Sequence, residues 1–262
     1  MVRTFLLLAW TWTRAAMEYP ATIALLTVGV MVSSSLDLAA ILVLFTHMRT
    51  LGGLDTAGAM LLYGSSQMSF GLSNLLIGAV DRLGQHIRQG TLDTMLIRPV
   101  SPLIQLATED FTPRKLGRLV PAVAVLAWGG SRAGLGPPDV LLTVLMVANG
   151  TLLFCAVWVL SASLQFVLIN GYEATKAITW GGSFATQYPM SLYGRDFVLG
   201  VTFAVPLAFV NWQPVLYILD LPDPLGLPVF VRFLGPAATA LLCAVAAVAW
   251  RTGLRHYRST GS

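Results

Sequence analysis

One stretch constrains this chain more than any other, because residues 140–169 contain no charged side chain. A helix rises about 1.5 Å per residue and the hydrocarbon core of a bilayer is about 30 Å thick, so roughly 20 such residues cross it. The composition agrees, since 56% of the residues are hydrophobic and 11% are charged, whereas soluble domains carry about 25% charged residues. We therefore predict a multi-pass membrane protein. An ordinary soluble enzyme, a disordered chain and a nucleic-acid-binding domain are excluded.

The apolar segments predict an all-α membrane protein that forms a single domain over residues 1–262, with six transmembrane helices. The segment at 171–193 is the weakest by hydropathy, since it carries Glu173, Lys176 and Gln187. The third segment could extend to residue 135. The six predicted spans are residues 21–45, 59–80, 116–128, 140–169, 171–193 and 233–250.

Residues 194–232 allow two interpretations. The part at 197–219 is apolar at first and is then interrupted by prolines. It could form a seventh span, or it could form a re-entrant hairpin of two short helices on the extracytoplasmic side. Non-helical backbone is tolerated at membrane depth only where protein covers it. A hairpin would therefore imply a surrounding bundle or dimer.

The distribution of lysine and arginine favours the hairpin. With six spans, twelve of the sixteen basic residues fall on one side, including Arg251, Arg255 and Arg258 of the C-terminal tail. The positive-inside rule places that side in the cytoplasm. We therefore predict a protein of the plasma (inner) membrane with both termini cytoplasmic, whereas seven spans would put the basic tail outside. This sidedness accounts for the net charge of +4 without a nucleic-acid partner.

The first 19 residues are predicted to form an amphipathic helix on the inner leaflet. Trp10 and Trp12 are typical of the membrane interface. A secretory signal is the weaker interpretation, because the apolar run is short and Arg14 and Glu18 follow it.

The cytoplasmic loop at 81–118 is divided by clear helix signals. Gly90 can end one helix in the left-handed conformation, and Thr91 can cap a short helix at 92–97. Pro99 stops that helix, and Ser101 followed by Pro102 starts another. The loop is either a solvated segment lying on the membrane or a docking element that a partner protein grips. The residues predicted to dock are Leu92, Asp93, Met95, Leu96, Arg98 and Pro99.

The run from Ile87 to Pro102 resembles the signature I-R-x-G-x-L-D-x-x-L-x-R-P-x-x-P of exporter permeases in the type 2 ABC superfamily. The resemblance implies a six-span subunit with a cytoplasmic coupling helix and an extracytoplasmic re-entrant hairpin. It also implies two partners, a separate ABC ATPase and a second permease of the same or a related chain. Thr91 departs from the pattern, because many members carry glutamate there, and this removes one charge from the docking face.

The chain lacks the motifs of an ATPase or a metalloenzyme. No G-x-x-x-x-G-K-[ST] occurs, and the lysines Lys115 and Lys176 do not follow glycine. We therefore expect no catalytic residue and no cofactor in this chain, with ATP and Mg²⁺ bound by the partner ATPase. The three histidines are far apart in sequence, so we interpret them as surface residues and predict no metal site.

Charge inside the predicted spans marks a further candidate. Asp37 lies within the first span, where it is either functional or near the outer end, snorkelling or paired with Arg49 or Arg132. Glu173 and Lys176 are spaced for pairing within one helix. Glycines in the second and fifth segments, Gly71, Gly78, Gly181 and Gly182, are predicted to permit close helix packing.

The predicted function is therefore that of a membrane permease subunit of an ATP-driven exporter. Two alternatives from other classes stay open. One is a secondary transporter driven by an ion gradient, and the other is a membrane scaffold that transports nothing. The substrate cannot be inferred from the residues.

Overall fold

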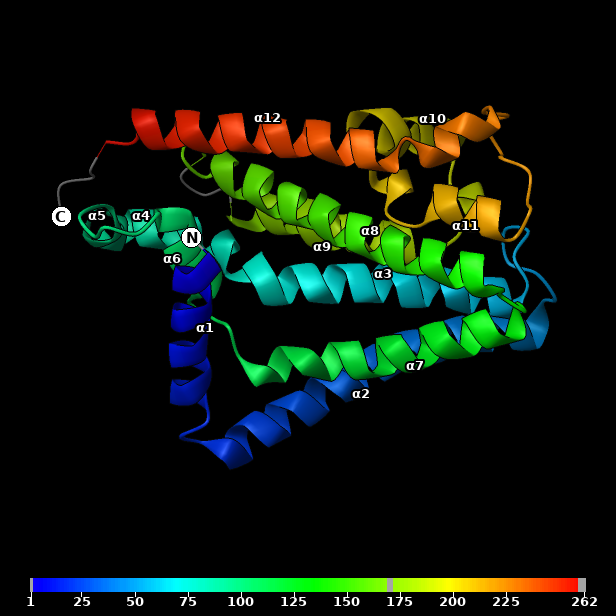
Figure 1. The fold of residues 1–262 in the computed structure, drawn as a ribbon, viewed down its shortest axis with the longest axis horizontal. Helices are drawn as coiled ribbons and strands as arrows, with labels where there is room; N and C mark the ends of the chain where they lie inside the picture. Colours follow the sequence, from blue (N-terminus) through cyan, green and yellow to red (C-terminus); the bar gives the residue numbers. More distant parts are fainter. Residues whose placement is uncertain (1, 169–171, 259–262) are drawn as a thin grey trace.

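A computed structural model describes residues 2–168 and 172–258, and the regular elements within these ranges are all helices. The long helices run roughly along the long axis of the molecule (Figure 1). They occupy the six predicted segments. Their bounds are α2 (Pro20–His47), α3 (Thr56–Ile77), α7 (Leu116–Arg132), α8 (Pro137–Leu164), α9 (Tyr172–Gln187) and α12 (Gly235–His256).

Three of the described helices, α2, α8 and α12, are long and apolar enough to cross a membrane. The helices α7 and α9 have 17 and 16 residues, and are therefore shorter than the usual span. The helix α9 ends at Gln187, two residues before Pro189, because a proline disfavours helical geometry in the residue that precedes it. The predicted fifth span, which ran to residue 193, was therefore too long. The helix α8 ends at Leu164, earlier than predicted, and residue 169 lies outside the described residues.

The helix α3 forms the centre of the bundle, where it packs against α7, α8 and α9. Two glycines let α3 and α7 approach closely. A Cβ atom on Gly64 would lie 2.7 Å from the backbone nitrogen of Leu126, and one on Gly129 would lie 2.7 Å from that of Leu61. Beside this contact, Phe70 of α3 packs against aromatic rings of α8 and α9.

The N-terminal helix α1 (Val2–Ala16) lies across one end of the bundle (Figure 1). The ring of Phe5 meets the ring of Phe111 edge-on at 6.1 Å. The Thr13 hydroxyl lies 3.3 Å from the Phe111 carbonyl oxygen. Much of the opposite face is apolar and exposed, including Leu6, Leu7 and Trp10. A helix is present where the sequence predicted one, and its role as an amphipathic helix on the inner leaflet stays a prediction.

Residues 194–232 contain short helices. These are α10 (Arg195–Leu199), a π-helical turn (Gly200–Ala204), a 3₁₀ turn (Leu207–Phe209), α11 (Trp212–Ile218) and a second 3₁₀ turn (Val229–Phe233). None of them is long enough to span a bilayer as a seventh helix. The helix α11 is anchored in the bundle, because Trp212, Val215 and Leu216 are buried. Beside it, the Asn211 side chain donates to the carbonyl oxygens of Leu62 and Thr186.

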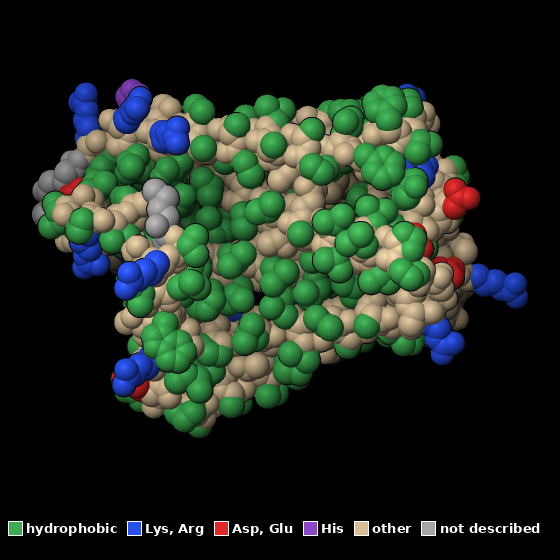
Figure 2. All heavy atoms as spheres, viewed as in Figure 1, with side chains coloured by type: hydrophobic (Ala, Val, Ile, Leu, Met, Phe, Trp, Pro, Cys, Tyr) green, Lys and Arg blue, Asp and Glu red, His purple; other side chains and the backbone are tan. Residues whose placement is uncertain are grey.

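Charged side chains gather at the two ends of the molecule, and apolar side chains cover much of the surface between them (Figure 2). The start of α1, the end of α12 and the short helices α4, α5 and α6 share one end (Figure 1). We call this end the loop end. The positions of the charges therefore match the arrangement expected of a protein embedded in a bilayer.

Candidate functional site at the loop end

The 81–118 loop is a chain of short helices. The left-handed conformation predicted for Gly90 is confirmed, with φ at +67°. The prediction that Thr91 caps the next helix was wrong, because Gly90 is the cap residue and Thr91 is already helical. The elements are a 3₁₀ turn (Gly78–Arg82), α4 (Leu83–Arg88), α5 (Thr91–Leu96), α6 (Pro102–Thr108) and a second 3₁₀ turn (Pro113–Lys115).

His86 connects three of these helices, which the sequence did not reveal. We expected a surface histidine, but His86 is buried. Its Nε2 atom lies 2.7 Å from Glu109 Oε2 and its Nδ1 atom lies 2.8 Å from the Thr91 hydroxyl. An imidazole has two ring nitrogens, so one side chain can hold α4, α5 and the end of α6 together. Thr91 thus has a structural partner at the position where the resembled family often has glutamate.

The residues predicted to dock a partner separate into two groups. Leu92 is fully buried and Met95 is half-buried, so they anchor α5. Asp93 is partly buried. Burial raises the pKa of Tyr257, which lies just beyond α12, and the Asp93 carboxylate raises that pKa further. Leu96, Arg98 and Pro99 are exposed.

Ile97 is the most exposed large apolar side chain of the loop, at 85%, and our prediction omitted it. Ile97 follows Leu92 by five positions, so it points away from the buried face of the turn. This spacing was the signal that could have identified it. The amide of Gln105 supports the turn, because it donates to the carbonyl oxygens of Met95 and Val100 at 2.9 and 2.8 Å.

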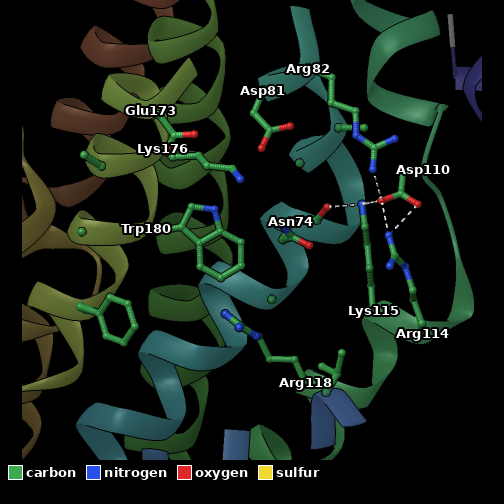
Figure 3. Close-up of a pocket in the computed structure, with 17 residues that line it drawn as sticks. Asn74, Asp81, Arg82, Asp110, Arg114, Lys115, Arg118, Glu173, Lys176 and Trp180 are labelled. Carbon is green, nitrogen blue, oxygen red and sulfur yellow. Dashed lines mark hydrogen bonds and ion pairs between the residues drawn. The ribbon is translucent and has the colours of Figure 1, made fainter. Parts of the chain in front are cut away.

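A cavity of about 740 Å³ lies behind the loop, between α3, α7 and α9 (Figure 3). We call it the basic pocket, because five basic and three acidic side chains line it. The charged lining residues are Asp81, Arg82, Asp110, Arg114, Lys115, Arg118, Glu173 and Lys176. Glu173 and Lys176 both enter the pocket from α9, and whether they pair with each other stays a prediction.

Three cations converge on the single carboxylate of Asp110 (Figure 3). Its Oδ2 atom lies 3.2 Å from Arg82 Nη2, 2.8 Å from Arg114 Nη2 and 3.8 Å from Lys115 Nζ. Lys115 also donates to the Asn74 carbonyl oxygen at 3.0 Å. Burial lowers the pKa of Lys115 from its usual 10.5 to about 8. The Asp110 carboxylate opposes this shift, and the positive charges of Arg114 and Arg82 add to it. Burial likewise raises the pKa of Asp81.

Arg118 faces the pocket from the first turns of α7. Its guanidinium carbon lies 5.2 Å from the centroid of the Phe70 ring and 5.1 Å from that of the Trp180 ring. Within the described residues no hydrogen bond or ion pair engages this guanidinium. The two aromatic rings therefore hold a positive charge beside the cavity.

Asp37 is half-buried in α2 and close enough to Arg118 and Tyr63 to interact with them electrostatically. Among the described residues it makes no ion pair with Arg49 or Arg132. Tyr63 donates to the Ser34 carbonyl oxygen at 3.0 Å and accepts from the Gln67 amide at 2.8 Å. Asp37 thus lies near a polar group inside the bundle, and its functional role stays a prediction.

Comparison with known proteins supports the resemblance drawn from the loop. A family described as "ABC-2 family transporter protein" matches residues 31–261. No curated protein and no solved structure matches significantly. The match covers most of the chain and agrees with the long apolar helices of a multi-pass membrane protein. The chain belongs to the ABC-2 family of transporter proteins.

Proposed function

We propose that this chain is the permease subunit of an ATP-driven exporter and that α5 couples it to a separate ABC ATPase. The observation that carries the proposal is the division of α5 into an anchored and an exposed side. Leu92 is fully buried, whereas Ile97 is 85% exposed beside exposed Arg98 and Pro99. An apolar residue flanked by charge suits a groove in a partner protein.

The proposed topology has six spans, formed by α2, α3, α7, α8, α9 and α12, with residues 194–232 as an extracytoplasmic re-entrant segment. The loop end then faces the cytoplasm and the protein resides in the plasma (inner) membrane. The short helices α7 and α9 require a bilayer that adapts locally, which costs fractions of a kcal/mol per Å of mismatch. The serines and glutamine of α3 are buried inside the bundle, so they do not face lipid.

The loop is connected to the spans by a route that could carry motion. The Gln165 amide, just after α8, donates to the Asp81 carbonyl oxygen and the Thr175 hydroxyl, both at 3.0 Å. Its carbonyl oxygen accepts from the backbone N–H of Gly84. A displacement of α4 would therefore reach α8 and α9 directly, and α5 would act through its packing against α4. We propose that closure of the partner ATPase around ATP and Mg²⁺ displaces α5 and rocks the bundle between inward-facing and outward-facing states.

A second permease, of the same or a related chain, would complete the translocation path. The basic pocket lies where α2, α3, α7 and α9 approach each other. On α2 the apolar side chains of Leu25, Val28, Val32 and Leu36 are exposed. Packing of a second permease against this face would cover them and enclose the path between two bundles.

The test is to purify the tagged chain from its native membranes and to quantify bound ABC ATPase by mass spectrometry. Ile97→Asp and Arg98→Glu should each remove most of the ATPase while the permease stays in the membrane. Phe230→Asp is the control, since Phe230 is also apolar and exposed but lies in the 3₁₀ turn Val229–Phe233, which packs against α11. Asp93→Ala and Arg98→Ala should also reduce transport-linked ATP hydrolysis.

Two results would contradict the proposal. Full ATPase recovery with both loop variants would exclude docking through α5. Absence of any ABC ATPase from the wild-type preparation would favour the secondary transporter or the scaffold.

A further inference from the structure

The basic pocket carries more positive charge than its own carboxylates can neutralise. Its lining holds five cationic side chains against Asp81, Asp110 and Glu173. The carboxylate of Asp110 already serves two arginines and a lysine. Burying like charges together is costly unless a counter-charge is present. The pocket is therefore suited to an anion supplied from outside the chain.

Several donors remain available for such an anion. Among the described residues, Arg82 uses only its Nη2 atom, on Asp110, and no hydrogen bond or ion pair engages Arg118, which faces two aromatic rings and lies within electrostatic reach of Asp37. The side chain of Arg82 is 39% exposed. Arginine presents its N–H groups in a planar fork that matches the oxygens of phosphate. The guanidinium groups of Arg82 and Arg114 meet at Asp110, so an anion with several oxygens on one centre can contact both of them at once.

The other wall of the pocket is apolar. Trp180 and Phe184 of α9 and Val30 of α2 line it, and Phe184 is 51% exposed. In Figure 3 Arg82, Arg114 and Lys115 lie across the pocket from Trp180, whereas Arg118 lies beside the Trp180 ring. One molecule could therefore place a charged head among the arginines and an apolar tail along α9.

We propose that the basic pocket binds the phosphate-bearing head of an anionic amphiphile. Arg82 and Arg114, whose guanidinium groups meet at Asp110, hold the phosphate oxygens. Arg118 adds positive charge beside Trp180, and Trp180 and Phe184 contact the apolar part. Two sources share this head-group chemistry, namely a membrane phospholipid and a free phosphate compound. The proposal concerns binding to this chain alone and does not depend on the coupling function of α5.

The experiment uses the full chain in neutral detergent and counts bound lipid by native mass spectrometry. Wild-type protein is titrated with phosphatidylglycerol, with zwitterionic phosphatidylcholine and, as a competitor, with inorganic phosphate. We expect a clear preference for phosphatidylglycerol. Arg82→Gln should weaken that binding about tenfold or more, because it removes charged hydrogen-bond donors to the phosphate. Arg118→Gln should weaken the binding by a smaller factor, because it removes a nearby positive charge.

Arg132→Gln is the matched control. Arg132 is the last residue of α7, at the opposite end of that helix from Arg118. Like the guanidinium of Arg118, that of Arg132 rests on an aromatic ring, 5.8 Å from the centroid of Trp128. This variant loses the same charge and should bind lipid like the wild type. Arg118→Lys keeps the charge and should recover part of the affinity, which separates a lost contact from a misfolded protein.

The arms of the titration identify the source and decide the proposal. Binding of phosphatidylglycerol that inorganic phosphate does not displace indicates a lipid, and displacement at millimolar phosphate indicates a free phosphate compound. Equal binding of both lipids, or unchanged binding in Arg82→Gln and Arg118→Gln, would overturn the proposal. No ATPase is present in this assay, so its failure would leave the coupling proposal unaffected.

Discussion

At the scale of single residues, Lys115 has the environment that conflicts most with its charge. Its side chain is 11% exposed and faces Asp110, Arg114, Arg82 and Asp81. Burial lowers its pKa from 10.5 to about 8. The folded protein therefore releases this proton at lower pH than the unfolded chain does. The cost of holding the charge is present in full below about pH 8 and is relieved as the pH rises toward 10.5.

This leads to a prediction about Lys115→Met. Relative to this variant, wild-type unfolding free energy should rise by up to about 3 kcal/mol between about pH 8 and 10.5, since one pKa unit corresponds to about 1.4 kcal/mol. At about pH 7 the variant should be at least as stable as the wild type, because Asp110 keeps two arginines. The measurement is thermal or denaturant unfolding in detergent. The free energy of unfolding of the variant is subtracted from that of the wild type at each pH, so the titration of the tyrosines, which both proteins share, cancels. A difference in unfolding free energy that does not change with pH would contradict the prediction.

At the scale of elements, the sequence predicted where helices lie better than how they touch. Apolar runs and proline signals located the six long helices and most of the short loop helices, because those signals are local. The glycines that we singled out, such as Gly71, were not those with the tightest backbone contacts. A Cβ on Gly71 would meet the flexible side chain of Leu119, whereas Gly64 and Gly129 face backbone atoms. Which helix faces which is a property of the whole bundle, so the pattern along one helix could not reveal it.

The contact between α3 and α7 allows a matched test. Gly64→Ala and Gly129→Ala should each lower stability by about 1–3 kcal/mol, because neighbouring backbone cannot move aside as a side chain can. Gly29→Ala is the control, since a Cβ there would meet nothing within 4 Å. It should be neutral or stabilising by up to about 1 kcal/mol, given the low helix propensity of glycine. The measurement is the melting temperature of each variant in detergent. Equal melting temperatures for all three variants would contradict the prediction, because they would show that α3 and α7 can move apart with no loss of stability.

At the scale of the whole molecule, the candidate site shows where prediction from sequence ended. The charges of the 81–118 loop were visible, but the pocket also needs Glu173, Lys176 and Trp180 from α9, far away in the chain. Similarly, His86 and Glu109 are 23 positions apart and meet only because the fold brings the end of α6 beside α4. The sequence thus located the loop, and the fold determined which of its residues anchor it and which are exposed.

The arrangement of the ends makes the topology testable. If six helices span the bilayer, the loop end and the C-terminal end of α12 lie in the cytoplasm, and residues 219–228 lie outside.

The native Cys155 and Cys243 are first replaced by alanine, and single cysteines are then introduced as Ile97→Cys, His256→Cys and Asp223→Cys. An impermeant maleimide applied to intact cells should label only the Asp223→Cys protein. The other two should react only after the membrane is opened. Labelling of His256→Cys in intact cells would place the basic tail outside, as a seven-span topology requires. In the folded chain Asp93 of α5 interacts with Tyr257 of the tail, so α5 and the tail must lie on the same side of the membrane. The fold therefore predicts, as the six-span topology does, that Ile97→Cys and His256→Cys react together and only after the membrane is opened.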